Sequence, residues 1–228
     1  MTLAPDAVRT MFDRIAPVYD LMNRAMTCGL DLRWRRLAAA AAVRPGDAVL
    51  DAACGTGDLA LAGLRAGARE VTGLDFSPRM LERARRKAPA ITWVQGDLLA
   101  LPFADGSFDA ATIGFGLRNV ADLELGLREL RRVLRPGGRL AILEITRPRG
   151  LLRPFFSLWF DRFVPLVGRL VPGGTAYAYL PESVRRFPGA EELAELVARA
   201  GFSGVRFRLL AGSIVALHTG TVQTGTSQ

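Results

Sequence analysis

The spacing of apolar residues changes where an alanine-rich stretch ends near residue 42. Before that point they recur every three or four positions, as at Val8, Met11, Phe12 and Ile15. This is the period of an amphipathic helix, whose apolar residues share one face. Pro17 interrupts this helix, and Asp31 can cap a longer one. Residues 1–45 are therefore predicted to form a helical N-terminal part.

Beyond residue 46, short apolar runs alternate with stretches of helical period. Five strands are predicted, at Ala48–Leu50, Glu70–Leu74, Ile91–Val94, Phe108–Ile113 and Arg139–Ile145. Ser77 and Asp122 are typical helix caps, and Pro136–Gly138 is a typical turn. Strands that alternate with helices predict an α/β fold with a doubly wound, mostly parallel sheet. Ligands of such sheets bind at the carboxyl ends of the strands.

An apolar segment at residues 147–190 interrupts this alternation. Charged residues and prolines divide its run from Leu151 to Val171, so we do not expect it to span a membrane. Two interpretations stay open. The segment either packs on the sheet as core helices, or forms a lid over an apolar substrate or a surface that touches a membrane.

The chain length suits one α/β domain. A closing helix is predicted at Glu191–Ala200, with strands at Val205–Leu210 and Ser213–His218. We therefore expect a single domain over residues 1–228, whose parts are residues 1–45, the core at 46–146, the apolar insertion at 147–190 and the closing part at 191–220.

The composition removes several kinds of site. Cys28 and Cys54 are the only cysteines and His218 is the only histidine, so a zinc site built from Cys and His is excluded and no metal is expected. Residues 1–20 lack the apolar core of a signal peptide. We expect the protein to work without a structural metal cluster, in a reducing cytoplasm.

A net charge of +8 raises the question of nucleic-acid binding. Lys87 is the only lysine, so nearly all of this positive charge is arginine. The arginines form scattered groups, of which Arg33, Arg35 and Arg36 are one. Most have helical spacing opposite an apolar stripe, which is typical of a helix face in water. The solvated-face interpretation is favoured, and no nucleic-acid partner is expected.

The main candidate site is a buried strand that ends at Asp51 and continues into a glycine-rich turn. Gly55 and Gly57 lack a Cβ, so the backbone there can approach a ligand closely. With Asp75 they also match the dinucleotide-binding fingerprint. A pyrophosphate, however, would face the like charges of Asp51 and Asp58. S-adenosylmethionine (SAM), a cation without phosphate, is therefore favoured over NAD.

Acidic residues also stand at the ends of other predicted strands. They are Asp51, Asp75, Asp97 and Glu144. Because the carboxyl ends of parallel strands meet at one edge of the sheet, these side chains are expected to share one cleft.

Several motifs resemble the ubiquinone/menaquinone biosynthesis C-methyltransferases, and the resemblance runs from about Met11 to Gly220. They are the segment Phe12–Asn23, the segment Gly29–Arg36, the turn Leu50–Asp58, and the segments Phe115–Val120, Tyr177–Pro188 and Ala216–Gly220. Phe115–Val120 is the most specific, because nucleic-acid amino-methyltransferases of similar fold carry Asn/Asp-Pro-Pro-aromatic at that place. The resemblance implies a Rossmann-like, class I SAM-dependent methyltransferase fold.

The resemblance also implies a SAM site. The methionine end would contact Gly55, Thr56 and Gly57, with the ammonium near Asp51. Asp75 would bind the ribose hydroxyls, and Asp97 and the Leu98 N–H would bind adenine. Gly114 lines this site where many members have Ser. Purely structural alternatives stay open, namely Asp51 as a strand-end cap, Asp75 as a helix cap and Asp97 as a turn residue.

Methyl transfer to a ring carbon needs electron density pushed from a neighbouring hydroxyl that loses its proton. The resemblance and this chemistry point to Arg118, which can stabilise a developing phenolate. Asn119 and Tyr19 would orient the ring hydroxyls. The alternative for Arg118 is a surface ion pair. We expect His218 to be a packing or edge residue on the last strand rather than a base.

The expected reaction is SAM-dependent C-methylation of a prenylated quinol, demethylmenaquinol to menaquinol. Because Gly114 departs from the family's usual residue, a second interpretation stays open. The chain would then be a methyltransferase of the same family that acts on a polyketide, a phenol or another apolar metabolite. A nucleic-acid-binding protein and an NAD-dependent oxidoreductase are the rivals from other classes. A homodimer and peripheral contact at the inner face of a membrane also stay open.

Overall fold

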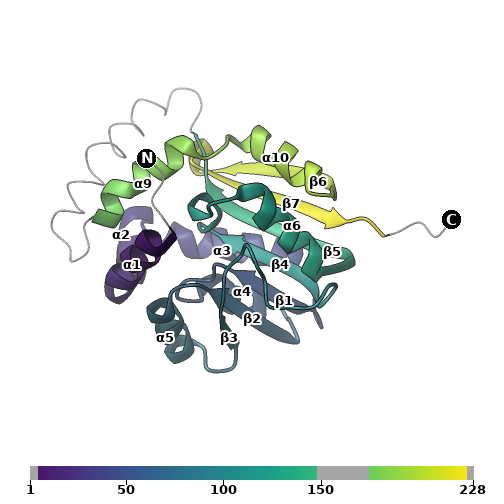
Figure 1. The fold of residues 1–228 in the computed structure, drawn as a ribbon, viewed down its shortest axis with the longest axis horizontal. Helices are drawn as coiled ribbons and strands as arrows, with labels where there is room; N and C mark the ends of the chain where they lie inside the picture. The colour runs from purple at the N-terminus through teal and green to yellow at the C-terminus, as the bar shows by residue number, and fades with distance from the viewer. Residues whose placement is uncertain (1–4, 148–174, 225–228) are drawn as a thin grey trace.

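The computed structural model of the chain describes residues 5–147 and 175–224 (Figure 1). Within them a seven-stranded sheet has the order β3-β2-β1-β4-β5-β7-β6. The strands are β1 (Ala48–Ala52), β2 (Glu70–Asp75), β3 (Thr92–Gln95), β4 (Phe108–Gly114), β5 (Leu134–Ile145), β6 (Phe202–Leu210) and β7 (Val215–Val222). The first five pair in parallel, and β7 is antiparallel to both β5 and β6. The predicted mostly parallel, doubly wound sheet is confirmed.

Helices cover both faces of this sheet (Figure 1). The α-helices of the described residues are α1 (Pro5–Ile15), α2 (Tyr19–Thr27), α3 (Leu30–Ala42), α4 (Asp58–Arg65), α5 (Pro78–Lys87), α6 (Leu123–Val133), α9 (Thr175–Arg186) and α10 (Ala190–Arg199). Short 3-10 turns are η1 (Ala16–Val18), η2 (Leu117–Asn119) and η5 (Ala211–Ser213).

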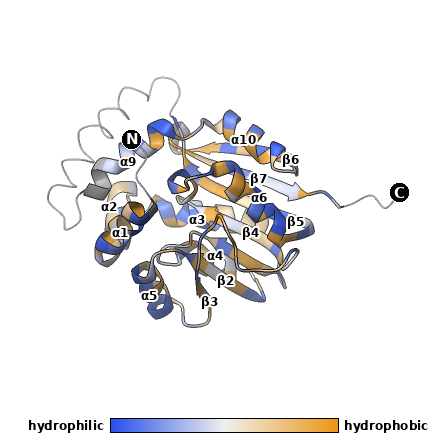
Figure 2. Ribbon diagram, viewed as in Figure 1, coloured by the Kyte–Doolittle hydropathy of each residue, from blue (hydrophilic) through white to orange (hydrophobic). Residues whose placement is uncertain are grey.

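Alternation along the central strands divides the core into two layers. In β1, Leu50 packs with α6 and α10, whereas Val49 packs with α3 and α4 on the other face. A parallel strand covered on both faces is buried at every position, and all five residues of β1 are buried. Figure 2 shows the same distribution, with hydrophobic colour on the sheet and hydrophilic colour on outward helix faces such as that of α5.

The predicted caps are partly right. Ser77 accepts a hydrogen bond from Met80 N, and Asp122 accepts one from Leu125 N, so both cap their helices. Asp31 does not cap α3, because Gly29 is the N-cap and adopts a φ of 76°. Asp31 lies inside the first turn of α3, buried and paired with arginines. The turn between α2 and α3 is made by left-handed backbone rather than by a side-chain cap.

The predicted turn Pro136–Gly138 is part of β5. The pairing of β4 with β5 skips there, because Phe108 faces Leu134 and Ala110 faces Arg139. Gly137, with a φ of 77°, allows this bulge. Several of the other strands run one or two residues beyond their predicted ends, since the acid after an apolar run still takes part in the ladder.

The apolar run from Leu151 to Val171 lies outside the described residues. The division of residues 1–228 into one domain with four parts therefore stays a prediction. Across residues 5–147 and 175–224, the helices are all too short or too polar to cross a bilayer.

Candidate functional site

The candidate site lies at the carboxyl ends of β1, β2 and β4. The chain runs from β1 outward to β2 and β3, then crosses back to β4 on the other side of β1. Such a reversal opens a crevice between neighbouring strand ends. Ala53 and Phe115, which follow β1 and β4, have left-handed φ values of 49° and 59°. Left-handed backbone is strained for residues with a side chain, and it gathers at binding sites.

Three adjoining cavities form this crevice. An inner cavity of about 20 Å³ is lined by Asp51, the glycine turn and Tyr19. A central cavity of about 40 Å³ shares Tyr19 and Gly55 with it. An outer cavity of about 270 Å³ shares Asp75 and Asn119 with the central one. The shared linings make one elongated cleft with a narrow polar end and a wide end.

Asp51 lies at the inner end and is fully buried. Its Oδ1 accepts a hydrogen bond of 2.8 Å from Thr112 Oγ1. Its Oδ2 is buried without a hydrogen-bond partner among the described residues. Burial raises the pKa of Asp51 to about 7, although the Thr112 hydroxyl, the Ala60 backbone N–H and the charge of Arg35 oppose that shift. A cationic ligand that reached Oδ2 would satisfy it, so Asp51 is more than a strand-end cap.

The glycine turn needs its two glycines for space and backbone freedom. Gly55 and Gly57 have φ values of 55° and 85°. A Cβ at Gly57 would lie 2.4 Å from Trp93 Cη2, which is closer than side chains approach. Thr56 is buried, and its Oγ1 donates to Asp20 at 2.5 Å and accepts from Lys87 at 3.1 Å. The Thr56 hydroxyl therefore ties the turn to α2 and α5.

Asp58, which follows the turn, is neutralised by two cations. Its carboxylate binds Lys87 Nζ and Arg24 Nη2, each at 2.8 Å. Burial disfavours its charge, but these two partners outweigh burial and lower the pKa of Asp58. The argument that Asp58 would repel a pyrophosphate is therefore wrong, and the case against a dinucleotide at this turn rests on Asp51.

Asp75 joins the central and outer cavities. Its two oxygens accept from Gly55 N at 2.8 Å and from Ser77 N at 2.9 Å. Burial raises the pKa of Asp75 to about 6, while these N–H donors oppose the shift. Each carboxylate oxygen keeps a second lone pair, so two hydroxyls of a ligand can still be bound. Ser77 caps α5 itself, so Asp75 is not the helix cap.

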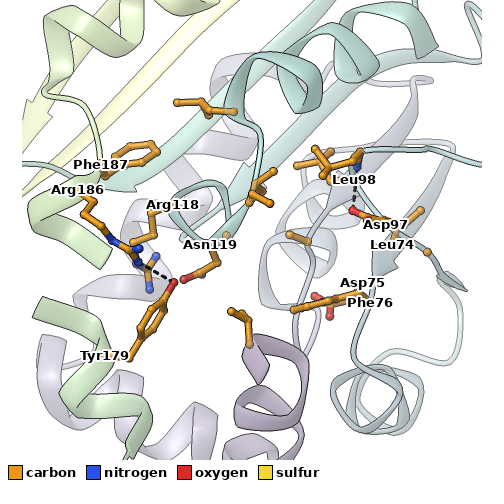
Figure 3. Close-up of a pocket in the computed structure, with 18 of the residues that line it drawn as sticks. Leu74, Asp75, Phe76, Asp97, Leu98, Arg118, Asn119, Tyr179, Arg186 and Phe187 are labelled. Atoms are coloured by element: carbon orange, nitrogen blue, oxygen red, sulfur yellow. Dashed lines mark hydrogen bonds between the residues drawn. The ribbon is translucent and has the colours of Figure 1, made fainter. Parts of the chain in front are cut away.

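Asp97 and Leu98 line the outer cavity (Figure 3). Asp97 is exposed, and its Oδ1 accepts from Leu99 N at 2.9 Å, which makes it a turn residue as well as a lining residue. Leu98 is buried between this loop and the core. Gly114 ends β4 and lines the inner and central cavities, where a Cβ would lie 3.0 Å from Leu59 Cδ2.

Arg118 lines the outer cavity, and its charge is already paired. Its Nη1 lies 2.8 Å from Glu144 Oε1, and both side chains are buried. Nη1 also donates to the Phe115 carbonyl, whereas the buried Nε has no partner in the described part of the chain. This pair is buried rather than on the surface. Asn119 lines the central and outer cavities, and Tyr19 the inner and central ones.

Two residues of the wide end were not predicted as site residues. Tyr179 and Arg186 of α9 line the outer cavity, opposite Asp97 and Leu98 (Figure 3). Arg186 Nη2 donates to the Tyr179 hydroxyl at 3.3 Å. Tyr179 stands in a family signature, which was the available signal. Arg186 carried no such signal, because the sequence places it among solvated arginines.

Arg35 is an exception to the solvated arginines. It is buried on α3 and lines the inner cavity beside Asp51. Its spacing to Asp31, one helical turn earlier, was the available signal for an ion pair.

His218 lies outside the cleft, on β7 between β5 and β6. Its Nε2 lies 2.8 Å from the Ala190 carbonyl, and burial lowers its pKa. It therefore packs in an interior strand rather than at an edge. Across the described ranges, no three His, Cys, Asp or Glu side chains gather where they could hold a metal ion.

The geometry fits SAM at the narrow end. The unpartnered Asp51 Oδ2 suits an ammonium group, and Asp75 has acceptors left for a ribose. The glycine turn admits a ligand against its backbone, and the cleft then widens toward Asp97 and Arg118. The wide end leaves room for a second, apolar molecule.

Comparisons with known proteins give the family and the fold of the chain. The model of the ubiE/COQ5 methyltransferase family matches residues 1–222. The chain is 50% identical to the demethylmenaquinone methyltransferase of Thermus thermophilus, covering 92% of this chain and 99% of that one. It is 43% identical to the 2-phytyl-1,4-naphtoquinone methyltransferase of Synechococcus elongatus, covering 94% and 97%. A SAM-dependent methyltransferase structure from Thermotoga maritima has the same fold, with a TM-score of 0.64, 23% identity and coverage of 92% and 98%.

Proposed function

Because the chain belongs to the ubiE/COQ5 methyltransferase family, we propose that it methylates a ring carbon of a prenylated quinol. It is a SAM-dependent methyltransferase. The proposed reaction converts demethylmenaquinol to menaquinol. Two relatives that cover nearly all of the chain are named for naphthoquinone substrates, which favours that ring over a benzoquinone.

The observation that carries this proposal is the polarity of the cleft. The narrow end has a buried acid with one free oxygen, and the wide end has an outer cavity of about 270 Å³. We assign the methionine end of SAM to Asp51 and the turn Gly55–Gly57. Asp75 takes the ribose hydroxyls, Asp97 and the Leu98 N–H take the adenine, and Gly114 borders the sulfonium.

SAM supplies an electrophilic methyl group on its sulfonium. Tyr19 and Asn119 meet in the central cavity, where they orient the ring hydroxyls so that the attacking carbon lies in line with that methyl. The hydroxyl proton leaves, the new carbon–carbon bond forms as the sulfur–carbon bond breaks, and the ring carbon then loses its own proton. The ring oxygen takes a proton back, so one proton is released overall and the product is a quinol. S-adenosylhomocysteine is the other product.

Arg118 stabilises the phenolate that forms when the hydroxyl loses its proton. Glu144 holds the Arg118 guanidinium at 2.8 Å, so the group is a fixed donor rather than a free charge. In the described part of the chain the side-chain contacts of Arg118 use Nη1, so Nη2 is the donor that remains for the substrate. A donor held in place before the reaction needs no reorganisation in the transition state.

The proposal is tested by incubating purified protein with labelled SAM and reduced demethylmenaquinone in detergent, with mass spectrometry of the quinol. A product heavier by one labelled methyl is expected. The oxidised quinone is the matched control, because it has no hydroxyl proton to lose and its ring is electron-poor. SAM binding without any methylated quinol would contradict the proposed substrate and favour another apolar metabolite.

We also propose that the enzyme meets this substrate in the cytoplasm at the inner face of the membrane. Three leucines of α2 and α3 support this, since Leu21, Leu30 and Leu32 are 69%, 43% and 36% exposed. Co-sedimentation with vesicles that contain anionic lipid is expected for the protein and reduced for Leu21→Ser. Equal sedimentation of both would contradict this contact. Sedimentation velocity on the same preparation tests whether the protein is a monomer or a homodimer.

A further inference from the structure

Arg35 stands apart from the other arginines of α3. Arg33 and Arg36 are exposed, whereas the Arg35 side chain is only 7% exposed. Its Nη1 lies 2.5 Å from Asp31 Oδ2, and its guanidinium carbon lies 5.2 Å from the centroid of the Phe115 ring. An ion pair on one side and an aromatic face on the other fix the plane of the guanidinium.

Arg35 and Asp51 line the same inner cavity. The charge of Arg35 acts on Asp51, yet among the described residues the two side chains share no hydrogen bond and Asp51 Oδ2 has no partner. Opposite charges that line one cavity without pairing leave room for a ligand between them. A ligand that carries both charges on adjacent atoms, such as an α-amino acid, matches this arrangement.

The net charge of the side chains around the inner cavity also matches that of SAM. The acids and bases around the cavity alternate in a chain of contacts: Arg35 binds Asp31, Arg24 binds Asp31 and Asp58, and Lys87 binds Asp58 and Asp20. Three positive and three negative side chains cancel, so ionised Asp51 is the charge left over. SAM carries a net charge of +1 and would balance it.

The carboxylate of SAM would nevertheless lie close to ionised Asp51, the acid whose charge is left over. Like charges in a partly dry cavity repel, so this carboxylate needs a cation of its own. Lys87 and Arg24 are already bound to two acids each, whereas Arg35 is bound to Asp31 alone. Of these three cations, Arg35 therefore has the fewest acidic partners, and it is the one that lines the inner cavity.

We propose that Arg35 binds the α-carboxylate of SAM, while Asp51 Oδ2 binds the α-ammonium. The two side chains then bind both charged groups at the amino-acid end of the methyl donor. This inference rests on the proposed assignment of that end to Asp51 and the glycine turn, and it does not depend on which quinol is methylated.

Decarboxylated SAM tests this inference, because it lacks only the carboxylate and keeps the amine, the sulfonium and the adenosine. Isothermal titration gives its affinity and that of SAM for the same protein, without any quinol. The unmodified protein is expected to prefer SAM by roughly 10- to 100-fold, as for a hydrogen-bonded charge pair. In Arg35→Met this preference is expected to vanish, because the acids that remain favour the more positive ligand.

Arg36→Met is the matched control. Arg36 is the next residue of α3 and is exposed, so its loss removes the same charge from the helix without touching the cavity. This variant is expected to keep the preference for SAM. Equal weakening of both ligands in Arg35→Met would overturn the inference, since it would mean that Arg35 only supports the fold around Asp31.

A second variant covers the case in which Arg35→Met does not fold because Asp31 loses a partner. The double variant Asp31→Asn, Arg35→Met removes both members of the buried pair and leaves no unpaired charge. It is expected to bind both ligands about equally, whereas Asp31→Asn alone keeps the preference. A preference that survives in the double variant would overturn the inference. Failure of quinol methylation would leave these affinities unchanged and contradict only the proposed substrate.

Discussion

The two ends of the cleft differ in size and in the side chains that line them. The inner cavity holds about 20 Å³ among charged and polar side chains that bind one another. The outer cavity holds about 270 Å³ and is lined mainly by apolar residues, with Arg118, Arg186 and Asp97 at its margins. One end is small and fixed by contacts within the protein, and the other is wide.

This difference matches what each end has to recognise. The amino-acid end of a methyl donor is the same in every reaction, so charges can be fixed in advance around it. A prenylated ring is large and apolar, and burial rather than hydrogen bonding supplies its affinity. Changing one charge at the inner end should therefore weaken SAM binding, whereas a change at the outer end should lower the rate of methyl transfer.

The largest effect is expected at Asp51. Asp51→Asn removes the one buried charge that the donor satisfies, so SAM affinity is expected to fall by roughly 100-fold or more. Isothermal titration measures it. Asp105→Asn is the control, because the Asp105 side chain is 80% exposed and lies away from the cavity linings. Unchanged affinity in Asp51→Asn would mean that the free oxygen faces something other than the donor.

At the outer end, Arg118→Ala is expected to lower kcat by roughly 100-fold, as for a lost transition-state donor. SAM affinity should stay within about 3-fold, because Arg118 lines only the outer cavity. Steady-state kinetics and titration on one preparation separate the two. Arg118→Ala leaves the buried Glu144 carboxylate without its partner. The double variant Arg118→Met, Glu144→Gln removes both charges and is the control for this effect. Equal losses in rate and affinity would place Arg118 in the donor site.

Asp75 stands between the two ends and should show an intermediate loss. Asp75→Ala removes both ribose contacts and the acceptor for two backbone N–H groups, so SAM affinity is expected to fall by roughly 30-fold. The variant Asp13→Ala is a useful comparison, because Asp13 contacts the Ser77 hydroxyl and lies outside the cavity linings. A SAM titration that Asp75→Ala leaves unchanged would overturn the ribose assignment.

SAM affinity should also depend on pH through the inner end. Burial raises the pKa of Asp51 to about 7 in the free protein, and a bound cation favours its ionised form. Binding below pH 7 must therefore release a proton, so affinity is expected to fall by about tenfold per pH unit there. Titrations in two buffers of different ionisation enthalpy count that proton. Asp51→Asn should bind with little dependence on pH between 6 and 8.

The smallest effect is on stability. The pKa of Asp51 lies at about 7 in the fold, above its usual 3.8. Its contribution to stability is thus fully present below the unfolded pKa and is lost as pH rises through 7. Ligand-free Asp51→Asn is expected to melt a few degrees higher than the unmodified protein at pH 8, about 4 °C. Calorimetry at pH 5 should show a smaller difference.

The sequence predicted the parts of this cleft that depend on strand ends. Asp51, Asp75 and Asp97 follow apolar runs, and parallel strands bring such positions together whatever the rest of the chain does. The glycine turn was predictable because Gly55 and Gly57 adopt positive φ values, which favour glycine. These are local rules, and the sequence states them directly.

Contacts between distant segments were less predictable. Arg35 looks like a solvated charge in the sequence, and Asp58 looks like an unpaired acid of the turn. Only the packing of α2, α3 and α4 buries Arg35 beside Asp31 and pairs Asp58 with Arg24. Arg186 likewise reaches the outer cavity through the placement of α9. Asp31 was assigned to a cap because its type suits one, but the left-handed Gly29 had already made the turn.

The only lysine of the chain, Lys87, is part of the network of ion pairs around the inner cavity. Lys87 Nζ lies 2.7 Å from Asp20 of α2 and 2.8 Å from Asp58 of α4, and it donates to Thr56 of the glycine turn. Apart from the chain's terminal amine, an amine-directed reagent has this one site. The rate at which Lys87 is acylated therefore reports how firmly Asp20 of α2 and Asp58 of α4 hold its Nζ. A change in this acylation rate when SAM is added would report donor binding at a single atom, Lys87 Nζ.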